Sequence, residues 1–198
     1  MTETARRPGD AVAGPALAGC VIAVTADRRF KELANALERR GATVEHAPAL
    51  VVVPHLDDES LVEHTRVIID APPDVVVATT GIGFRGWIEA ADAAGLAEDL
   101  LDVFASARLI ARGPKARGAI EAAGLTADWV AQSETAAEIE EFLLAEGVDG
   151  VRIAVQLHGS GADGLDEAFA AAGALVSSVV VYSWGASDPD VLAASVGR

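Results

Sequence analysis

The sequence has 198 residues, 51% hydrophobic and 5% aromatic, with 15 basic against 30 acidic side chains and a formal net charge of −15. This length suits one or two small domains, and such acidity argues against nucleic acid or an anionic membrane as the partner of the whole surface. The single cysteine, Cys20, excludes an internal disulfide and favours the cytoplasm, and no run reaches the roughly 18 apolar residues of a membrane span.

The N-terminal residues 1–18 resemble a lipoprotein signal at first sight, because Arg6 and Arg7 precede an alanine-rich stretch that ends in LAGC. Proline, glycine and aspartate interrupt that stretch, whereas the core of a signal peptide is continuously apolar. We therefore expect a mobile tail here, followed by a buried strand that starts at Cys20.

The rest of the chain repeats one unit: an apolar strand, a turn rich in glycine or basic residues, and an amphipathic helix. We expect strands or extended segments at 20–26, 43–54, 75–80, 108–112, near Trp129, 152–158 and 174–184. The expected helices cover 30–40, 57–70, about 84–94, about 115–123, a segment capped by Ser133, and about 163–172. This alternation predicts a parallel sheet with helices on both faces.

Two extended runs, 49–56 and 176–184, flank the middle of the chain and could pair with each other as a connector. The sequence after Trp184 offers at most the start of a helix, so the first unit, residues 19–47, has few partners. A lone strand–helix–strand fragment cannot bury both of its faces. Either this unit docks on the middle domain, or the sequence is part of a longer protein.

The glycine pattern G-x-G-x-x-G occurs twice, at Gly81, Gly83 and Gly86 and again at Gly159, Gly161 and Gly164. A dinucleotide site also needs an acidic residue at the end of the next strand, to hold a ribose hydroxyl. Here that strand ends at Arg112, and Asp102 lies before it. NAD(P) or flavin binding, and with it an oxidoreductase, therefore stays a rival hypothesis.

Four turns follow strands, at 25–31, 79–86, 111–118 and 157–164. Their net charge is positive, whereas that of the whole sequence is negative. Their basic residues are Arg28, Arg29, Lys31, Arg85, Arg112, Lys115 and Arg117, against the acids Asp27 and Asp163. Ligands of parallel sheets bind at these turns, and helix N-termini there favour anions. We expect an anion site at Gly81, Gly83, Arg85, Arg112, Lys115, His158, Gly159, Ser160 and Gly161. The alternative is that these cations merely solvate loops.

The remaining candidate groups are few. The four histidines lack ligand spacing, so we expect no metal site. Trp87 and Trp129 read as packing residues. Tyr182 ends an apolar strand, where its phenol could face a cleft or play a structural part.

At this point the sequence resembles the uroporphyrinogen-III synthase family. The resemblance lies in the order of VTADRR, ERRGATV and HAPAL, then DVVVATTGIGF with WIEAA, RLIARGPKARGAIEAAGL, SETAAEI, RIAVQLHGSG and GALVSSVVVYSW. It covers about residues 19–184 and implies two Rossmann- or flavodoxin-like parallel-sheet α/β domains joined by a two-stranded connector. The implied parts are a tail (1–18), an incomplete first domain (19–47), connector strands (48–56 and 176–184), a second domain (57–175) and a truncated return segment (185–198).

The resemblance further implies a cofactor-independent lyase of porphyrin and heme biosynthesis, monomeric and cytoplasmic. Such an enzyme cyclises the polycarboxylate hydroxymethylbilane to uroporphyrinogen III, inverting ring D and losing water. Tyr182 matches the tyrosine thought to assist departure of the hydroxyl, and Thr79, Thr80 and Gly113 match substrate-binding positions. Ala116 and Ser183 depart from the Thr and Arg that relatives often carry. The alternative is a non-catalytic sensor module that binds a tetrapyrrole or another anion.

Overall fold

The computed structural model describes residues 15–54, 59–157, 161 and 163–186. The chain divides into two compact units, one formed by Met1–Val51 with Gly185–Arg198 and the other by Val52–Trp184. Among the described helices, none is long and apolar enough to cross a membrane. We refer to these parts as unit 1 and unit 2.

Unit 1 contains the strand–helix–strand fragment expected at its start. Its described elements are β1 (Val21–Ala26), α1 (Phe30–Glu38) and most of β2 (Thr43–Pro54). β1 pairs with β2 in parallel, and β8 (Tyr182–Ala186) adjoins β2 to give the order β1-β2-β8. β2 and β8 each include residues of both units, and they are neighbours in this sheet.

Two expectations for this region need correction. Cys20 is exposed and β1 is mostly exposed, with Val21 at 66%, because no described element covers that side of the strand. Residues 15–18 do not belong to a free tail, since the Leu17 N–H donates to the Arg40 carbonyl oxygen at 2.8 Å. Residues 1–14 of the expected tail lie outside the described residues.

Unit 2 is a parallel sheet between two layers of helices. In chain order its elements are α2 (Glu59–Asp70), β3 (Val75–Ala78), α3 (Gly81–Ala93), α4 (Ala97–Ser106), β4 (Arg108–Ala111), α5 (Pro114–Ala122), β5 (Trp129–Val130), α6 (Ala136–Glu146), β6 (Arg152–Leu157), α7 (Leu165–Ala171) and β7 (Leu175–Val180). The strand order is β5-β4-β3-β6-β7, and every neighbouring pair is parallel. The expected α/β fold class is therefore confirmed.

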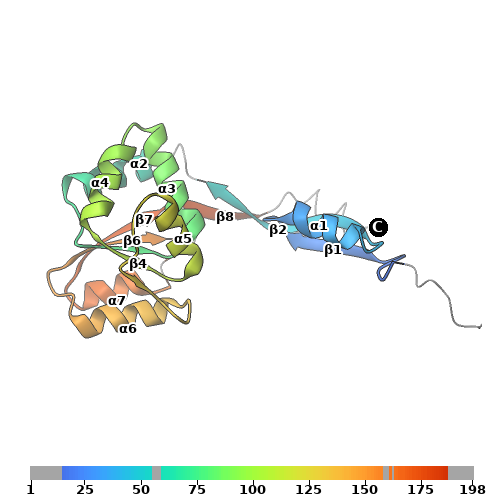
Figure 1. Cartoon of the computed structure of the whole chain (residues 1–198). Coiled ribbons are helices and arrows are strands. Elements are labelled where there is room, and N and C mark those ends of the chain that lie inside the picture. Colours follow the sequence, from blue (N-terminus) through green and yellow to red (C-terminus); the bar gives the residue numbers. More distant parts are fainter. Residues whose placement is uncertain (1–14, 55–58, 158–160, 162, 187–198) are drawn as a thin grey trace, which may run out of the picture. The chain divides into compact units, whose positions relative to one another are not determined.

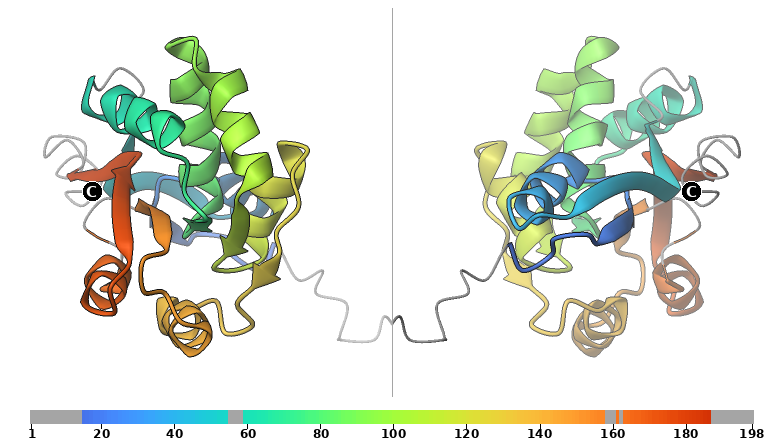
Figure 2. Two further views of the ribbon diagram at one scale, coloured as in Figure 1. Left: turned by 90° about the vertical axis from the view of Figure 1, so that its left-hand side faces the viewer. Right: turned by 90° about the vertical axis from the view of Figure 1, so that its right-hand side faces the viewer.

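Alternation along β3 shows how the sheet is covered. Val76 and Ala78 join the apolar cluster that contains residues of α2, α3, α4 and α5, whereas Val75 and Val77 join the cluster of α6 and α7. Figures 1 and 2 show these two groups of helices on opposite faces of the sheet. All four side chains are buried, which explains why the strand reads as a continuous valine run.

The first tryptophan lies in this core, as expected. Trp87 is fully buried, packs edge-on to Phe104 with ring centroids 5.0 Å apart, and donates its indole N–H to Thr65 Oγ1 at 2.9 Å. Trp129 is half-buried and stacks on Phe142 at 4.2 Å. Both residues therefore have packing roles.

The structure differs from the expected helices in three places. α3 begins at Gly81 rather than near 84, because Thr80 caps it. α4 was not expected, although its apolar residues follow helical spacing. α6 is capped by Thr135, whose hydroxyl accepts from the Glu138 N–H at 3.3 Å, so Ser133 is not the cap.

The last expected strand is two strands. Residues 175–180 form β7 and pair along their whole length with β6, from Arg152↔Leu175 to Leu157↔Val180. Residues 176–180 therefore belong to the five-stranded sheet and not to a connector, contrary to the expectation. The pairing breaks at Val181, and the chain resumes as β8 in the smaller sheet.

Candidate functional site

The strand order of unit 2 marks one edge of the sheet for ligand binding. β3 is its first strand in the chain and lies in the centre, with β4 and β5 added on one side and β6 and β7 on the other. The direction of winding therefore reverses between β3 and β6. Ligands of doubly wound sheets bind at such a switch point, outside the carboxyl ends of the strands.

At this switch point, side chains at the ends of β3 and β6 form hydrogen bonds that join the two strands. Thr79 Oγ1 donates to the Gln156 carbonyl oxygen at 2.6 Å, and the Thr80 N–H donates to Gln156 Oε1 at 3.1 Å. Gln156 Nε2 donates to the Leu157 carbonyl oxygen at 2.6 Å. Gln156 is fully buried and Thr79 is 4% exposed, so this network lies inside the protein at the carboxyl ends of β3 and β6.

Thr80 also begins the next helix. Its backbone is extended, and its Oγ1 accepts from the Gly83 N–H at 3.1 Å, which satisfies one N–H of the first turn of α3. No acidic residue lies in that first turn, so the partial positive charge of the helix end is not neutralised within the helix. The first turn of α3 therefore keeps its partial positive charge next to Thr80.

Close packing accounts for Gly81 and Gly83, two glycines of the first G-x-G-x-x-G pattern. A Cβ atom on Gly81 would lie 2.2 Å from the Lys115 carbonyl oxygen, and one on Gly83 would lie 2.0 Å from Gln156 Nε2. Both glycines are buried against protein atoms, and the Gly83 N–H is already donated to Thr80. These glycines thus allow α3 to approach α5 and β6.

The turn after β4 brings basic groups to the same edge. Arg112 follows β4 directly, its N–H donates to the Ala78 carbonyl oxygen at 3.0 Å, and its side chain is half-buried. Its Nη1 lies 3.0 Å from Asp163 Oδ2, at the turn after β6. β3 lies between β4 and β6, so this ion pair spans the end of the central strand.

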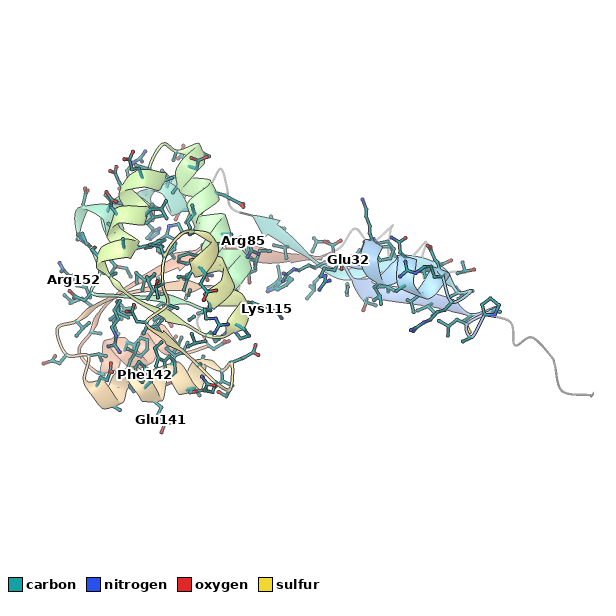
Figure 3. The ribbon with its side chains drawn as sticks, viewed as in Figure 1. Glu32, Arg85, Lys115, Glu141, Phe142 and Arg152 are labelled. Atoms are coloured by element: carbon teal, nitrogen blue, oxygen red, sulfur yellow. The ribbon has the colours of Figure 1, made fainter. Side chains whose placement is uncertain are left out.

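Arg85 and Lys115 are exposed, and among the described residues neither forms an ion pair with an acidic side chain. Figure 3 shows both on one side of unit 2, at α3 and α5, with the labelled Arg152 at the other side. Arg152 starts β6 and pairs with Asp74 at 3.4 Å. Arg85 and Lys115 therefore lie toward the carboxyl ends of the strands, and Arg152 lies at an amino end.

The excess of basic over acidic side chains at the turns after the strands is smaller in the structure than the sequence of the four turns predicts. Arg29 pairs with Glu32 in unit 1, and Arg117 pairs with Glu121 at 3.4 Å in unit 2. The fold also brings Glu134 to the start of α5, where its Cγ would lie 3.0 Å from a Cβ on Gly113. Glu134 belongs to a fifth turn that follows a strand, the turn between β5 and α6.

Tyr182 lies at this edge but not as an exposed ring. The side chain is 4% exposed and belongs to the apolar cluster beneath α3, so the expectation of a ring in a cleft and outside a core is wrong. The reason is that Val181 and Tyr182 follow β7 directly and stay under the helix. The Tyr182 hydroxyl oxygen lies 3.5 Å from Thr80 Oγ1, at the outer limit of a hydrogen bond.

Some predicted residues cannot be placed at the site. His158, Gly159 and Ser160 lie outside the described residues. Gly161 is described and has a positive φ of 139°, and a Cβ there would meet no atom of the described residues within 4 Å. Within the part of the chain that the structure describes, no group of three or more His, Cys, Asp or Glu side chains could hold a metal ion.

The family model and the solved structures that match this chain carry the same family name. A family model described as Uroporphyrinogen-III synthase HemD matches residues 31–196. A crystal structure of uroporphyrinogen III synthase from Thermus thermophilus is 32% identical, with a TM-score of 0.63, covering 87% of this chain and 64% of that one. A mutant form of the enzyme from the same bacterium is 27% identical, with a TM-score of 0.70 and coverage of 87% and 65%.

A protein of Bacillus subtilis strain 168, described as the uncharacterized protein YjjA, is 26% identical over 169 residues. That match covers 85% of this chain and 62% of the relative. The chain therefore spans less than two thirds of the length of these relatives. Since the family model matches well over half of the sequence, the chain belongs to the uroporphyrinogen-III synthase family.

Proposed function

We propose that this protein is a uroporphyrinogen-III synthase, which closes hydroxymethylbilane to uroporphyrinogen III with inversion of ring D and loss of water. The observation that carries the proposal is the meeting of the Thr80 and Tyr182 hydroxyls, 3.5 Å apart, at the switch point of a sheet in a chain of this family. From the resemblance we also propose that the enzyme is a lyase that needs no cofactor and acts as a monomer in the cytoplasm.

In this reaction the main task of the protein is to position the substrate. Loss of the substrate hydroxyl gives a reactive azafulvene, ring D attacks through a spiro intermediate, and the inverted ring closes the macrocycle. Since the substrate also closes without enzyme, the site has to hold one conformer and exclude the other closure. A hydrogen bond from the Tyr182 phenol to the departing hydroxyl would make it a better leaving group.

The edge of the sheet suits a ligand with many carboxylates. Arg85 and Lys115 are exposed cations on one side of unit 2, and the N-terminus of α3 adds partial positive charge. Thr79 is committed to the Gln156 carbonyl, so Thr80 is the hydroxyl of the pair that faces Tyr182. We therefore assign the acetate and propionate arms to Arg85 and Lys115, and the reacting end to Thr80 and Tyr182.

The proposal is tested by the isomer of the product. Purified protein is incubated with freshly generated hydroxymethylbilane, and the products are oxidised to porphyrins and separated chromatographically. We expect the type III isomer in clear excess, since uncatalysed closure gives type I. Formation of type I alone, at the rate of the protein-free control, would refute the proposal.

One observation favours a second candidate, a module that binds a tetrapyrrole or another anion without turnover. The Tyr182 ring is 4% exposed, which limits its access to a substrate. Calorimetric titration with uroporphyrin separates the two candidates when combined with the isomer assay. Tight binding without type III product supports the binding module, and type III product supports the synthase.

A further inference from the structure

Gln156 is a fully buried polar side chain that no sequence pattern singles out, since it lies inside the apolar strand β6. Its amide reaches across to the end of β3. Gln156 Oε1 accepts from the Thr80 N–H at 3.1 Å, and Nε2 donates to the Leu157 carbonyl oxygen at 2.6 Å. Burying an amide is costly unless it is hydrogen-bonded, and both ends of this one are.

The partners fix which way the amide points. The Thr80 N–H can only donate, so the oxygen of Gln156 faces it, and the Leu157 carbonyl can only accept, so the nitrogen faces that group. In this orientation Oε1 also lies 3.5 Å from Thr80 Oγ1. The Thr80 hydroxyl is thus enclosed by the Gln156 oxygen, the Gly83 N–H at 3.1 Å and the Tyr182 hydroxyl.

We propose that Gln156 is a positioning residue for the reaction, acting through Thr80; this rests on the proposed synthase activity. Because Gln156 has no exposed surface, it cannot touch substrate itself. Its amide holds the Thr80 backbone at the end of the sheet, and this sets where the Thr80 hydroxyl meets Tyr182. A small displacement of such a group is costly, because reacting groups must be held within fractions of an ångström.

The first variant, Gln156→Leu, keeps the approximate size of the side chain and removes both polar groups. We expect kcat for type III product to fall roughly 10- to 100-fold with little change in KM, since the substrate arms bind elsewhere. The Thr80 amide should exchange its hydrogen with solvent faster, because it loses its acceptor.

The second variant, Gln156→Glu, makes the effect depend on pH. Burial raises the pKa of a carboxyl group at this position, so the group stays neutral in mildly acidic solution. The neutral acid can accept from the Thr80 N–H and donate to the Leu157 carbonyl, as the amide does. We expect type III turnover close to that of the wild type at low pH and a progressive loss, relative to the wild type, as the carboxyl ionises.

The matched control is Thr65→Val, which removes a buried hydroxyl of the same unit that accepts from Trp87 and donates to the Leu61 carbonyl. It should lose stability without changing the type III fraction. The positioning role alone is overturned if folded Gln156→Leu turns over like the wild type. If Gln156→Leu fails to fold, the role is overturned when the pH profile of Gln156→Glu is identical to that of the wild type. A wild-type protein that gives type I product alone overturns the synthase proposal, and this inference with it.

Discussion

Gly81→Ala tests whether the glycine motif serves packing. The new Cβ would lie 2.2 Å from the carbonyl oxygen and 2.8 Å from the carbonyl carbon of Lys115. These are backbone atoms of α5, so they cannot rotate away as a side chain could. Restoring an ordinary contact requires a shift of about 1.2 Å between the first turns of α3 and α5, and overpacking of this kind costs about 1–3 kcal/mol.

A gain in helix propensity offsets part of this cost, because alanine is favoured over glycine in a helix by about 0.5–1 kcal/mol. We expect a net loss of about 1–2 kcal/mol. At roughly 4 °C per kcal/mol for a unit of this size, Tm should fall by about 4–8 °C. All three tryptophans lie in unit 2, so thermal unfolding followed by tryptophan fluorescence reports on this unit.

The matched control is Gly118→Ala in α5, the helix whose Lys115 carbonyl the new Cβ on Gly81 would meet. A Cβ there would meet nothing within 4 Å, so the helix propensity acts alone and should raise Tm by about 2–4 °C. If Gly81→Ala is as stable as the wild type, or as Gly118→Ala, the packing explanation of the motif is wrong.

Three further predictions follow from the site and its surroundings. Tyr182→Phe should lower type III turnover strongly while Tm changes by less than about 2 °C, because the hydroxyl makes one long contact at 3.5 Å; a destabilised but fully active variant would remove the phenol from the mechanism. Changing Arg112 and Lys115 together to Ala should weaken uroporphyrin binding, most at low ionic strength, and equal affinity at all salt concentrations would contradict this. The Arg152 N–H donates to Asp74 and lowers the pKa of that carboxyl, so Asp74→Asn should destabilise at pH 7, with the difference in urea unfolding closing as the pH falls below about 4.

Much of unit 2 could be predicted from the sequence because its strands and helices carry local signals. The valine run of β3 is buried on both faces, which is what a central parallel strand requires. The break between β7 and β8 left no such signal, since valines continue through Val181. Pairing with β6 decides where β7 ends, and that is a contact between distant parts of the chain.

The candidate site was predicted only in part for the same reason. Thr79 and Thr80 stand at the end of a recognisable strand, so the turn could be located from the sequence. Gln156 and Glu134 are brought to it by the strand order and by the turn after β5. No local pattern distinguishes a glutamine that spans two strands from one that faces solvent.

The glycine pattern at Gly81, Gly83 and Gly86 is one that two kinds of site can use. In a dinucleotide site the glycines let the backbone approach a pyrophosphate. Here Gly81 faces the Lys115 carbonyl, Gly83 faces Gln156, and the Gly83 N–H is donated to Thr80. The glycine surfaces that would approach a phosphate are therefore turned inward onto protein atoms. In the proposed site, the anionic arms of the ligand would therefore be held mainly by the exposed side chains of Arg85 and Lys115, and not by a main-chain cradle of the kind that the glycine pattern predicts.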